Sequence, residues 1–185
     1  MLRTFIAVKI APTPPLEQVL ARLAAFGWPV RAVAADKLHV TLKFLGETQE
    51  SLVPEISRVL EHAVSERPAF SVTLAGLGAF PSPTRPNSIW AGLQNAQTLM
   101  DIAADLENTL ARLGFAPEQR PFTPHLTLAR VKARPPTELA AILQQYSQAQ
   151  FGPAPIDDVE YLSSELLPAG PRYATLAAAK LQERS

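Results

Sequence analysis

The chain contains no cysteine among its 185 residues. This absence excludes disulfides, thiol nucleophiles, iron–sulfur clusters and zinc sites built from thiolates. Histidine is also scarce, with three copies at His39, His62 and His125. Few other side chains exchange a proton near neutral pH. Acid–base chemistry in this protein is therefore expected to depend on a very short set of residues.

No excess of one charge is present, because 17 Lys and Arg balance 17 Asp and Glu. Proteins that coat long nucleic acids or anionic membranes need many cationic contacts, so the balance argues against long duplex nucleic acid and membranes as partners. The chain also lacks an uninterrupted apolar run near the ~18 residues of a membrane span. The apolar run at 4–8 is too short for a secretory signal. These features predict a cytoplasmic protein, with a monomer as the default.

The apolar positions, 47% of the chain, alternate between the spacing of strands and that of helices. The order β-α-β-α-β occurs twice, and one further strand follows at the end. The expected strands are 4–10, 38–45, 70–80, 88–93, 125–131, 159–166 and 173–180, and the expected helices are 16–26, 49–64, 96–113 and 137–146.

The two units have similar internal spacing. Ile6 precedes His39 by 33 residues, and Ile89 precedes His125 by 36. This repetition predicts an α+β fold of two pseudo-symmetric β-α-β-α-β lobes. We expect a single two-lobed domain over 1–185, with lobe one at about 1–82 and lobe two at about 87–185. The boundary falls in a proline-rich turn, and the termini are free to exchange strands between lobes.

A short motif stands at the same point of both units. His39-Val40-Thr41-Leu42 begins one predicted strand, and His125-Leu126-Thr127-Leu128 begins the other. Residues i and i+2 of a strand share a face, so each histidine lies beside its threonine while the intervening residues are buried. One such motif is weak evidence, because His and Thr are ordinary strand residues. Two copies at equivalent positions argue against a purely structural role.

Two imidazoles that face one phosphorus atom suit phosphodiester cleavage without a metal. The neutral imidazole removes a proton from attacking water, and the protonated one donates to the departing oxygen. Thr41 and Thr127 can donate hydrogen bonds to the non-bridging oxygens. Opposite protonation states at one pH predict a bell-shaped pH dependence. The residues alone leave open which histidine is the acid.

Further segments match a known family together with the two motifs. They are 3–8, 38–47, 76–81, 89–92, 121–130, 163–166 and Tyr173. Through these segments, which span nearly the whole chain, the sequence resembles the two-histidine (2H) phosphoesterase superfamily. Within it, the similarity is to the RNA 2′,3′-cyclic phosphodiesterases, also called 2′-5′ RNA ligases (LigT-like).

The resemblance implies antiparallel sheets that face each other across a central cleft. It implies metal-independent hydrolysis of RNA 2′,3′-cyclic phosphodiester ends to 2′-phosphomonoesters, with no cofactor. The partner would be RNA with a 2′,3′-cyclic phosphate terminus or a cyclic nucleotide. By the same resemblance, His39 is the proton donor to the leaving 3′-oxygen and His125 the proton acceptor from water. Thr41 and Thr127 correspond to phosphate ligands.

Supporting roles fall on three other residues. Lys43 lies two positions beyond Thr41 on the predicted face of His39, and it could neutralise phosphate, with an exposed cation at a strand end as its alternative. Arg130 could do the same, but alternation places it opposite His125 unless the strand bulges. Phe122, in a proline-bounded loop before His125, is a candidate for stacking on a base, with core packing as its alternative.

The other aromatic residues and the third histidine are expected to lie outside the site. Phe5 and Trp90 are also aromatic, but core packing is the expected role of both. His62 is expected on the surface of a helix, and a metal site built from the other two histidines would lack a third ligand.

Two alternatives share the same pattern. The same site could join a 2′,3′-cyclic phosphate to a 5′-hydroxyl through a 2′-5′ bond, although abundant water favours hydrolysis. A non-catalytic module that binds RNA ends or nucleotides is the other alternative, but binding alone would not require two histidines.

Overall fold

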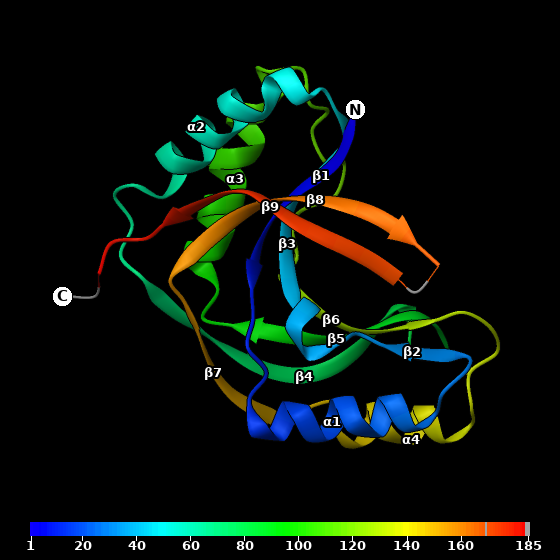
Figure 1. Cartoon of the computed structure of the whole chain (residues 1–185). Coiled ribbons are helices and arrows are strands. Elements are labelled where there is room, and N and C mark those ends of the chain that lie inside the picture. The colour runs from blue at the N-terminus through cyan, green and yellow to red at the C-terminus, as the bar shows by residue number, and fades with distance from the viewer. Residues whose placement is uncertain (169, 184–185) are drawn as a thin grey trace.

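The strands form two antiparallel sheets in the computed structural model, which describes residues 1–168 and 170–183 (Figure 1). The first sheet has the order β3-β1-β8-β9 and the second has β2-β6-β5-β4-β7. The helices are α1 (Pro14–Ala25), α2 (Val53–Val64), α3 (Gln97–Ala111) and α4 (Glu138–Gln145), with short 3₁₀ turns at Ala35–Lys37 and Glu50–Leu52. The strands are β1 (Leu2–Lys9), β2 (Val30–Ala32), β3 (His39–Thr48), β4 (Phe70–Ser82), β5 (Arg85–Gln94), β6 (His125–Val131), β7 (Gln150–Ile156), β8 (Asp158–Leu167) and β9 (Gly170–Lys180).

All the helices and strands expected from the sequence are present, and two strands were not expected. β2 has only three residues, too few to show an alternating pattern. β7 contains a glycine and two prolines, which normally argue against a strand. It lies at the end of the second sheet, where it pairs with β4 along one side, and an edge position tolerates prolines.

The two sequence units exchange their last strands. The histidine strand of each unit pairs with that unit's first strand, as β3 does with β1 and β6 with β5. The first strand then pairs with the last strand of the other unit, β1 with β8 and β5 with β4. The proline-rich segment 82–87, expected as the boundary between the lobes, closes the hairpin between β4 and β5, and each sheet contains strands from both units.

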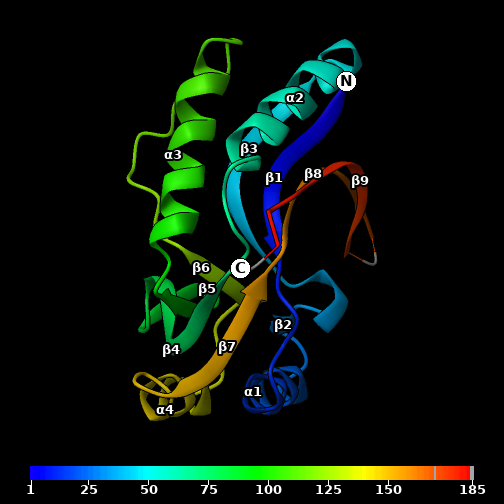
Figure 2. The same cartoon turned by 90° about the vertical axis from the view of Figure 1, so that its left-hand side faces the viewer.

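The helices cover the outer faces of the sheets. In Figures 1 and 2, α2 and α3 lie together at one end of the molecule, while α1 and α4 lie at the other. α2 packs against β8 and β9, α3 against β3, α1 against β7, and α4 against β4. Their apolar stripes join the sheets in one hydrophobic core. No helix in the described ranges is long and apolar enough to cross a membrane.

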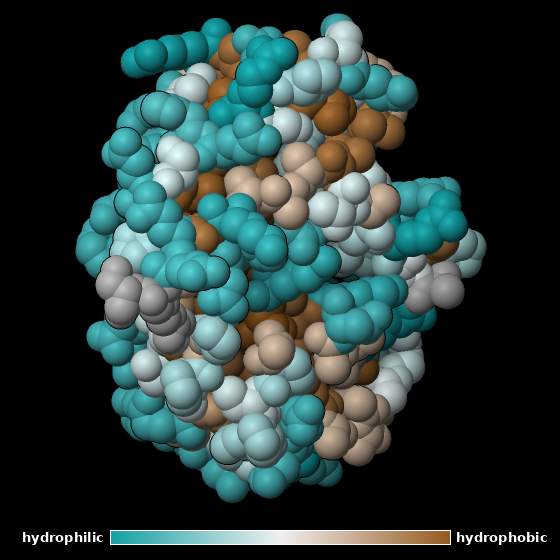
Figure 3. Space-filling view, turned by 60° about the vertical axis from the view of Figure 1, so that its left-hand side comes forward, coloured by the Kyte–Doolittle hydropathy of each residue, from teal (hydrophilic) through white to brown (hydrophobic). Residues whose placement is uncertain are grey.

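The opposite face of the first sheet has its own small apolar cluster. Phe5, Ala7 and Leu162 are buried there, and Tyr173 packs against them. Because alternate residues of β1 enter the main core, this cluster lies on the side away from the helices. The outer surface in Figure 3 is mostly hydrophilic, and part of its hydrophobic surface shows in hollows near the middle. The first histidine motif, on β3, lies on the face of this small cluster.

Candidate active site

Both histidine motifs have the orientation that strand alternation predicts. His39 is the first residue of β3 and His125 the first residue of β6. Val40, Leu42, Leu126 and Leu128 enter the hydrophobic core. His39, Thr41, His125 and Thr127 are half-buried on the other faces of their strands. We call these four residues, together with Arg130, the two-histidine site.

The two imidazoles are held by the same backbone contact. His39 Nδ1 lies 2.8 Å from the carbonyl oxygen of Lys37, and His125 Nδ1 lies 2.8 Å from that of Thr123. A carbonyl oxygen only accepts a hydrogen bond, so each Nδ1 carries a hydrogen and donates it. In the neutral ring, Nε2 is then the unprotonated nitrogen. Each histidine therefore has Nε2 as its atom for proton exchange.

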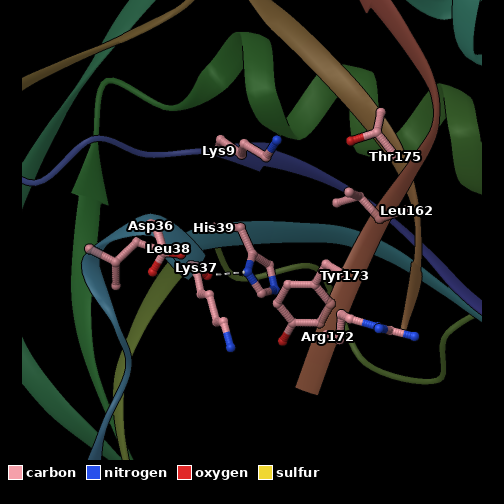
Figure 4. Close-up of a pocket in the computed structure, with 9 residues that line it drawn as sticks. All are labelled: Lys9, Asp36, Lys37, Leu38, His39, Leu162, Arg172, Tyr173 and Thr175. Carbon is pink, nitrogen blue, oxygen red and sulfur yellow. Dashed lines mark hydrogen bonds between the residues drawn. The ribbon is translucent and has the colours of Figure 1, made fainter. Parts of the chain in front are cut away.

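Aromatic rings fix the orientation of His39. Its ring centroid lies 5.2 Å from that of Phe5 on β1 and 5.3 Å from that of Tyr173 on β9, which meets it edge-on. Figure 4 shows the tyrosine ring beside the imidazole and the hydrogen bond to Lys37. Phe5 and Tyr173 also contact each other, with centroids 5.3 Å apart. The imidazole is therefore confined on two sides.

His125 has an equivalent environment in the second sheet. Phe80 on β4 meets it edge-on with ring centroids 5.1 Å apart, and Trp90 on β5 lies 6.4 Å away. Trp90 passes directly over Gly78, where an added Cβ would be 2.2 Å from the indole ring. Only glycine at that position allows this close approach. The position of Trp90, and with it one wall around His125, depends on Gly78.

Arg130 lies on the same face as His125 because β6 contains a bulge. Thr127 pairs with Trp90 and Ala129 pairs with Ile89, so Leu128 is an extra residue in the register. Leu128 and Ala129 are both buried, and Arg130 is exposed. The sequence placed Arg130 in the site only if such a bulge occurred, and the bulge is present.

The charge of Arg130 reaches the opposite motif. Burial lowers the pKa of His39 below its ordinary value, and the nearby guanidinium of Arg130 lowers it further. The hydrogen bond to Lys37 opposes both effects. Arg130 also acts on Tyr173. Burial raises the pKa of that tyrosine above its ordinary value, and the charge of Arg130 opposes part of the rise. The faces of the two histidine strands therefore meet around Arg130.

The position of Lys43 differs from the prediction that it binds phosphate. β3 has a bulge like that of β6, because Thr41 pairs with Ala7 while Lys43 pairs with Ile6. The extra residue turns Lys43 into the protein, where it is 2% exposed. Its Nζ donates to Glu107 Oε1 at 2.9 Å and to the carbonyl oxygen of Ala116 at 2.8 Å. Lys43 therefore joins β3 to the α3 region.

Two aromatic positions also differ from expectation. Phe44 is the counterpart of Arg130 in the bulged register and is 58% exposed, so it takes the surface position predicted for Lys43. Phe122 packs against the main hydrophobic core, which is the alternative to base stacking that the sequence left open. Tyr173 contacts His39 and Phe80 contacts His125, and no local sequence pattern indicated either contact.

A cavity of about 210 Å³ adjoins His39. Its cationic side chains already have partners: Lys9 pairs with Glu160 at 2.8 Å, Lys37 Nζ donates to the carbonyl oxygen of Pro171 at 2.9 Å, and Arg172 pairs with Glu165. Within residues 1–168 and 170–183, no group of three or more His, Asp or Glu side chains is placed to hold a metal ion.

Two antiparallel sheets that bring paired His-x-Thr strands to one site define the class of two-histidine phosphoesterases, and the predicted α+β fold is confirmed. The profile of the 2′-5′ RNA ligase superfamily matches residues 12–165. The chain belongs to this superfamily.

Known relatives resemble the chain over nearly its whole length. The RNA 2′,3′-cyclic phosphodiesterase of Aeropyrum pernix is 38% identical over 167 residues, which cover 87% of this chain and 94% of that protein. The crystal structure of TT0787 from Thermus thermophilus has a TM-score of 0.78 at 28% identity, covering 99% of this chain and 100% of that one. LigT of E. coli complexed with 3′-AMP has a TM-score of 0.76 at 28% identity, covering 97% and 98%.

Proposed function

We propose that this protein hydrolyses the 2′,3′-cyclic phosphodiester at the 3′ end of RNA to a 2′-phosphomonoester, with His39 and His125 as acid and base. The observation that carries the proposal is the matched pair of imidazoles, each with Nδ1 held by a carbonyl and Nε2 left for proton exchange. The activity named for the relative from Aeropyrum pernix supports the choice of substrate. Because both motifs lie in one chain, a monomer is sufficient.

The reaction needs one proton removed and one supplied. The base takes a proton from water through Nε2 as the water oxygen forms a bond to phosphorus. The bond from phosphorus to the 3′-oxygen breaks, and the acid donates its Nε2 proton to that oxygen, which leaves the phosphate on the 2′-oxygen. Thr41, Thr127 and Arg130 stabilise the charge on the non-bridging oxygens.

The family resemblance makes His39 the proton donor and His125 the proton acceptor, and we propose the same assignment. In the free protein, burial and Arg130 lower the pKa of His39, which disfavours its protonated form. A bound phosphodiester adds a negative charge beside the ring and raises that pKa. Substrate binding would thus favour the protonated state that His39 needs.

The direct test uses an oligonucleotide with a 2′,3′-cyclic phosphate, incubated with the protein in EDTA. The expected product carries a 2′-phosphate, and its formation is lost in His39→Ala and in His125→Ala. His62→Ala, on α2, is the matched control and retains full activity. A wild-type protein that binds the RNA without cleaving it would overturn the proposal in favour of a binding module, and a need for added divalent metal would overturn the two-histidine mechanism.

The competing ligase activity is tested in the same reaction. Adding a second oligonucleotide with a 5′-hydroxyl gives the site a choice between water and an alcohol. We expect hydrolysis to dominate because water is far more concentrated and needs no second binding site. A 2′-5′ linked product that exceeds the 2′-phosphate product would make ligation the main reaction.

A further inference from the structure

Two arginines stand opposite each other beside the two-histidine site. In the antiparallel pair of β2 and β6, Arg31 is the direct partner of Arg130, so both side chains are on the same face. Both are exposed. Neither forms an ion pair with a carboxylate in the part of the chain that the structure describes. Like charges directly opposite each other are unfavourable, and an anion bound between them would remove that cost.

The cations on the other side of His39 do not offer the same opportunity. Lys9 and Arg172 pair with glutamates, and Lys37 donates to a backbone carbonyl. An anion bound there would have to compete with these contacts. An anion bound at Arg31 and Arg130 would not have to displace a carboxylate, since no carboxylate of the described residues pairs with either arginine. The distribution of free positive charge therefore favours the β2 side for additional phosphate.

An exposed tryptophan accompanies Arg31. Trp28 is 66% exposed, and the guanidinium carbon of Arg31 lies 5.7 Å from the centroid of its ring. Bases of single-stranded nucleic acid stack on such aromatic rings, and arginine adds a cation–π contribution. Stacking of this kind tolerates any base, because every base has a π-face. Trp28 and Arg31 together offer one contact for a base and one for a phosphate.

The position of β2 sets the place of this contact along an RNA strand. β2 is the edge strand next to β6, which carries His125, Thr127 and Arg130. Neighbouring strands lie about 4.8 Å apart, so Arg31 is one strand spacing beyond the row that faces the reacting phosphate. Because the cyclic phosphate ends the chain, the neighbouring phosphate along the strand belongs to the linkage on the 5′ side of the terminal nucleotide.

We infer that Trp28 and Arg31 form a second RNA subsite, which binds the phosphodiester and the base immediately 5′ of the terminal nucleotide. The inference rests on the proposed function and refines its substrate class. The enzyme acts on RNA of two or more nucleotides in preference to a free cyclic mononucleotide. The terminal cyclic phosphate is held by the two-histidine site, and the preceding linkage by Arg31.

The test compares a diadenosine oligonucleotide ending in 2′,3′-cyclic phosphate with adenosine 2′,3′-cyclic phosphate. Arg31→Gln should lower kcat/KM for the dinucleotide by about tenfold and leave the mononucleotide unchanged. It should also reduce the slope of log(kcat/KM) against log[salt] by about one. Trp28→Ala should raise KM for the dinucleotide alone. Arg58→Gln, a change of equal charge on α2, should affect neither substrate.

Other outcomes would overturn the subsite. Equal losses on both substrates would assign Arg31 to the terminal phosphate, and no loss on the dinucleotide would leave it without a role in binding.

A separate measurement distinguishes this failure from failure of the proposed function. If the wild type cleaves neither substrate, the proposed hydrolysis is wrong, and fluorescence polarisation with a labelled dinucleotide ending in 2′-phosphate still tests the subsite. Weaker binding by Arg31→Gln than by Arg58→Gln would support the subsite, and equal binding would refute it.

Discussion

The placement of Lys43 leads to a prediction that separates a structural cation from a phosphate ligand. Its side chain is 1% exposed and that of Glu107 is 25% exposed, with 2.9 Å between Nζ and Oε2. Glu107 Oε1 also accepts a hydrogen bond of 2.6 Å from the backbone N–H of Glu118. Glu107→Gln keeps the size of the side chain and removes its charge. The ammonium of Lys43 would then be buried without a counter-ion, and its acceptors would be the neutral amide oxygen at position 107 and the carbonyl oxygen of Ala116.

The expected loss follows from this burial. Removing one partner of a fully buried ion pair costs about 3–5 kcal/mol. Water screens the partly exposed Glu107, so we expect a loss of about 2–3 kcal/mol in the free energy of unfolding. At roughly 2–4 °C per kcal/mol, Tm falls by about 4–12 °C. Lys43→Met removes the buried charge itself and should cost about 1–2 kcal/mol through the unpaired carbonyl oxygen.

Urea unfolding followed by circular dichroism measures these losses, and the double variant Lys43→Met/Glu107→Gln should lose less than the sum of the single changes. Activity on cyclic-phosphate RNA is measured under conditions in which every variant is folded. It should stay within about twofold of the wild type, because none of these variants changes a residue of the two-histidine site. A tenfold fall in kcat/KM for Lys43→Met at unchanged stability would refute the reasoning and return Lys43 to the phosphate.

Three further predictions concern the histidines and their surroundings. A substrate with sulfur in place of the leaving 3′-oxygen needs no proton donor, so it should restore cleavage by His39→Ala but not by His125→Ala; the reverse pattern would exchange the two roles. Arg130→Gln removes a positive charge that lowers the pKa of His39, so NMR titration should find that pKa raised. The limb of the pH–rate profile governed by His39 should move to higher pH. An unchanged pKa would mean that Arg130 does not face His39. Gly78→Ala should displace Trp90 and lower kcat by about 10- to 100-fold in a protein whose circular dichroism stays native, whereas wild-type kcat would contradict the contact.

The repeated motif was sufficient to locate the histidines, but not the cations around them. In both motif strands the alternation of buried and exposed residues holds through the leucine, Leu42 or Leu128. One extra residue then reverses it, which removes Lys43 from the site and brings Arg130 into it. The extra residue is defined by the pairing with β1 or β5, so no local pattern contains it. The consecutive apolar residues Leu128 and Ala129 were the only local sign.

The remaining differences arise from pairing between distant segments. The proline-containing β7 is a strand because β4 offers it an edge, and the contact of Tyr173 with His39 depends on β9 joining the first sheet. Helices were easier to predict, since their apolar stripes are local in sequence and all four lie within a few residues of the expected ranges.

The exchange of last strands has a consequence for how this molecule could arise and be divided. A single β-α-β-α-β unit would lack the neighbour that its first strand requires, so two identical units could complete their sheets only as an intertwined pair. Such a pair would carry two equal imidazoles related by a two-fold rotation axis. Fusion into one polypeptide frees each half to diverge, and Arg130 and Phe44 at matching positions mark that divergence. Separate expression of 1–82 and 87–185 should accordingly yield material that folds only when both pieces are mixed.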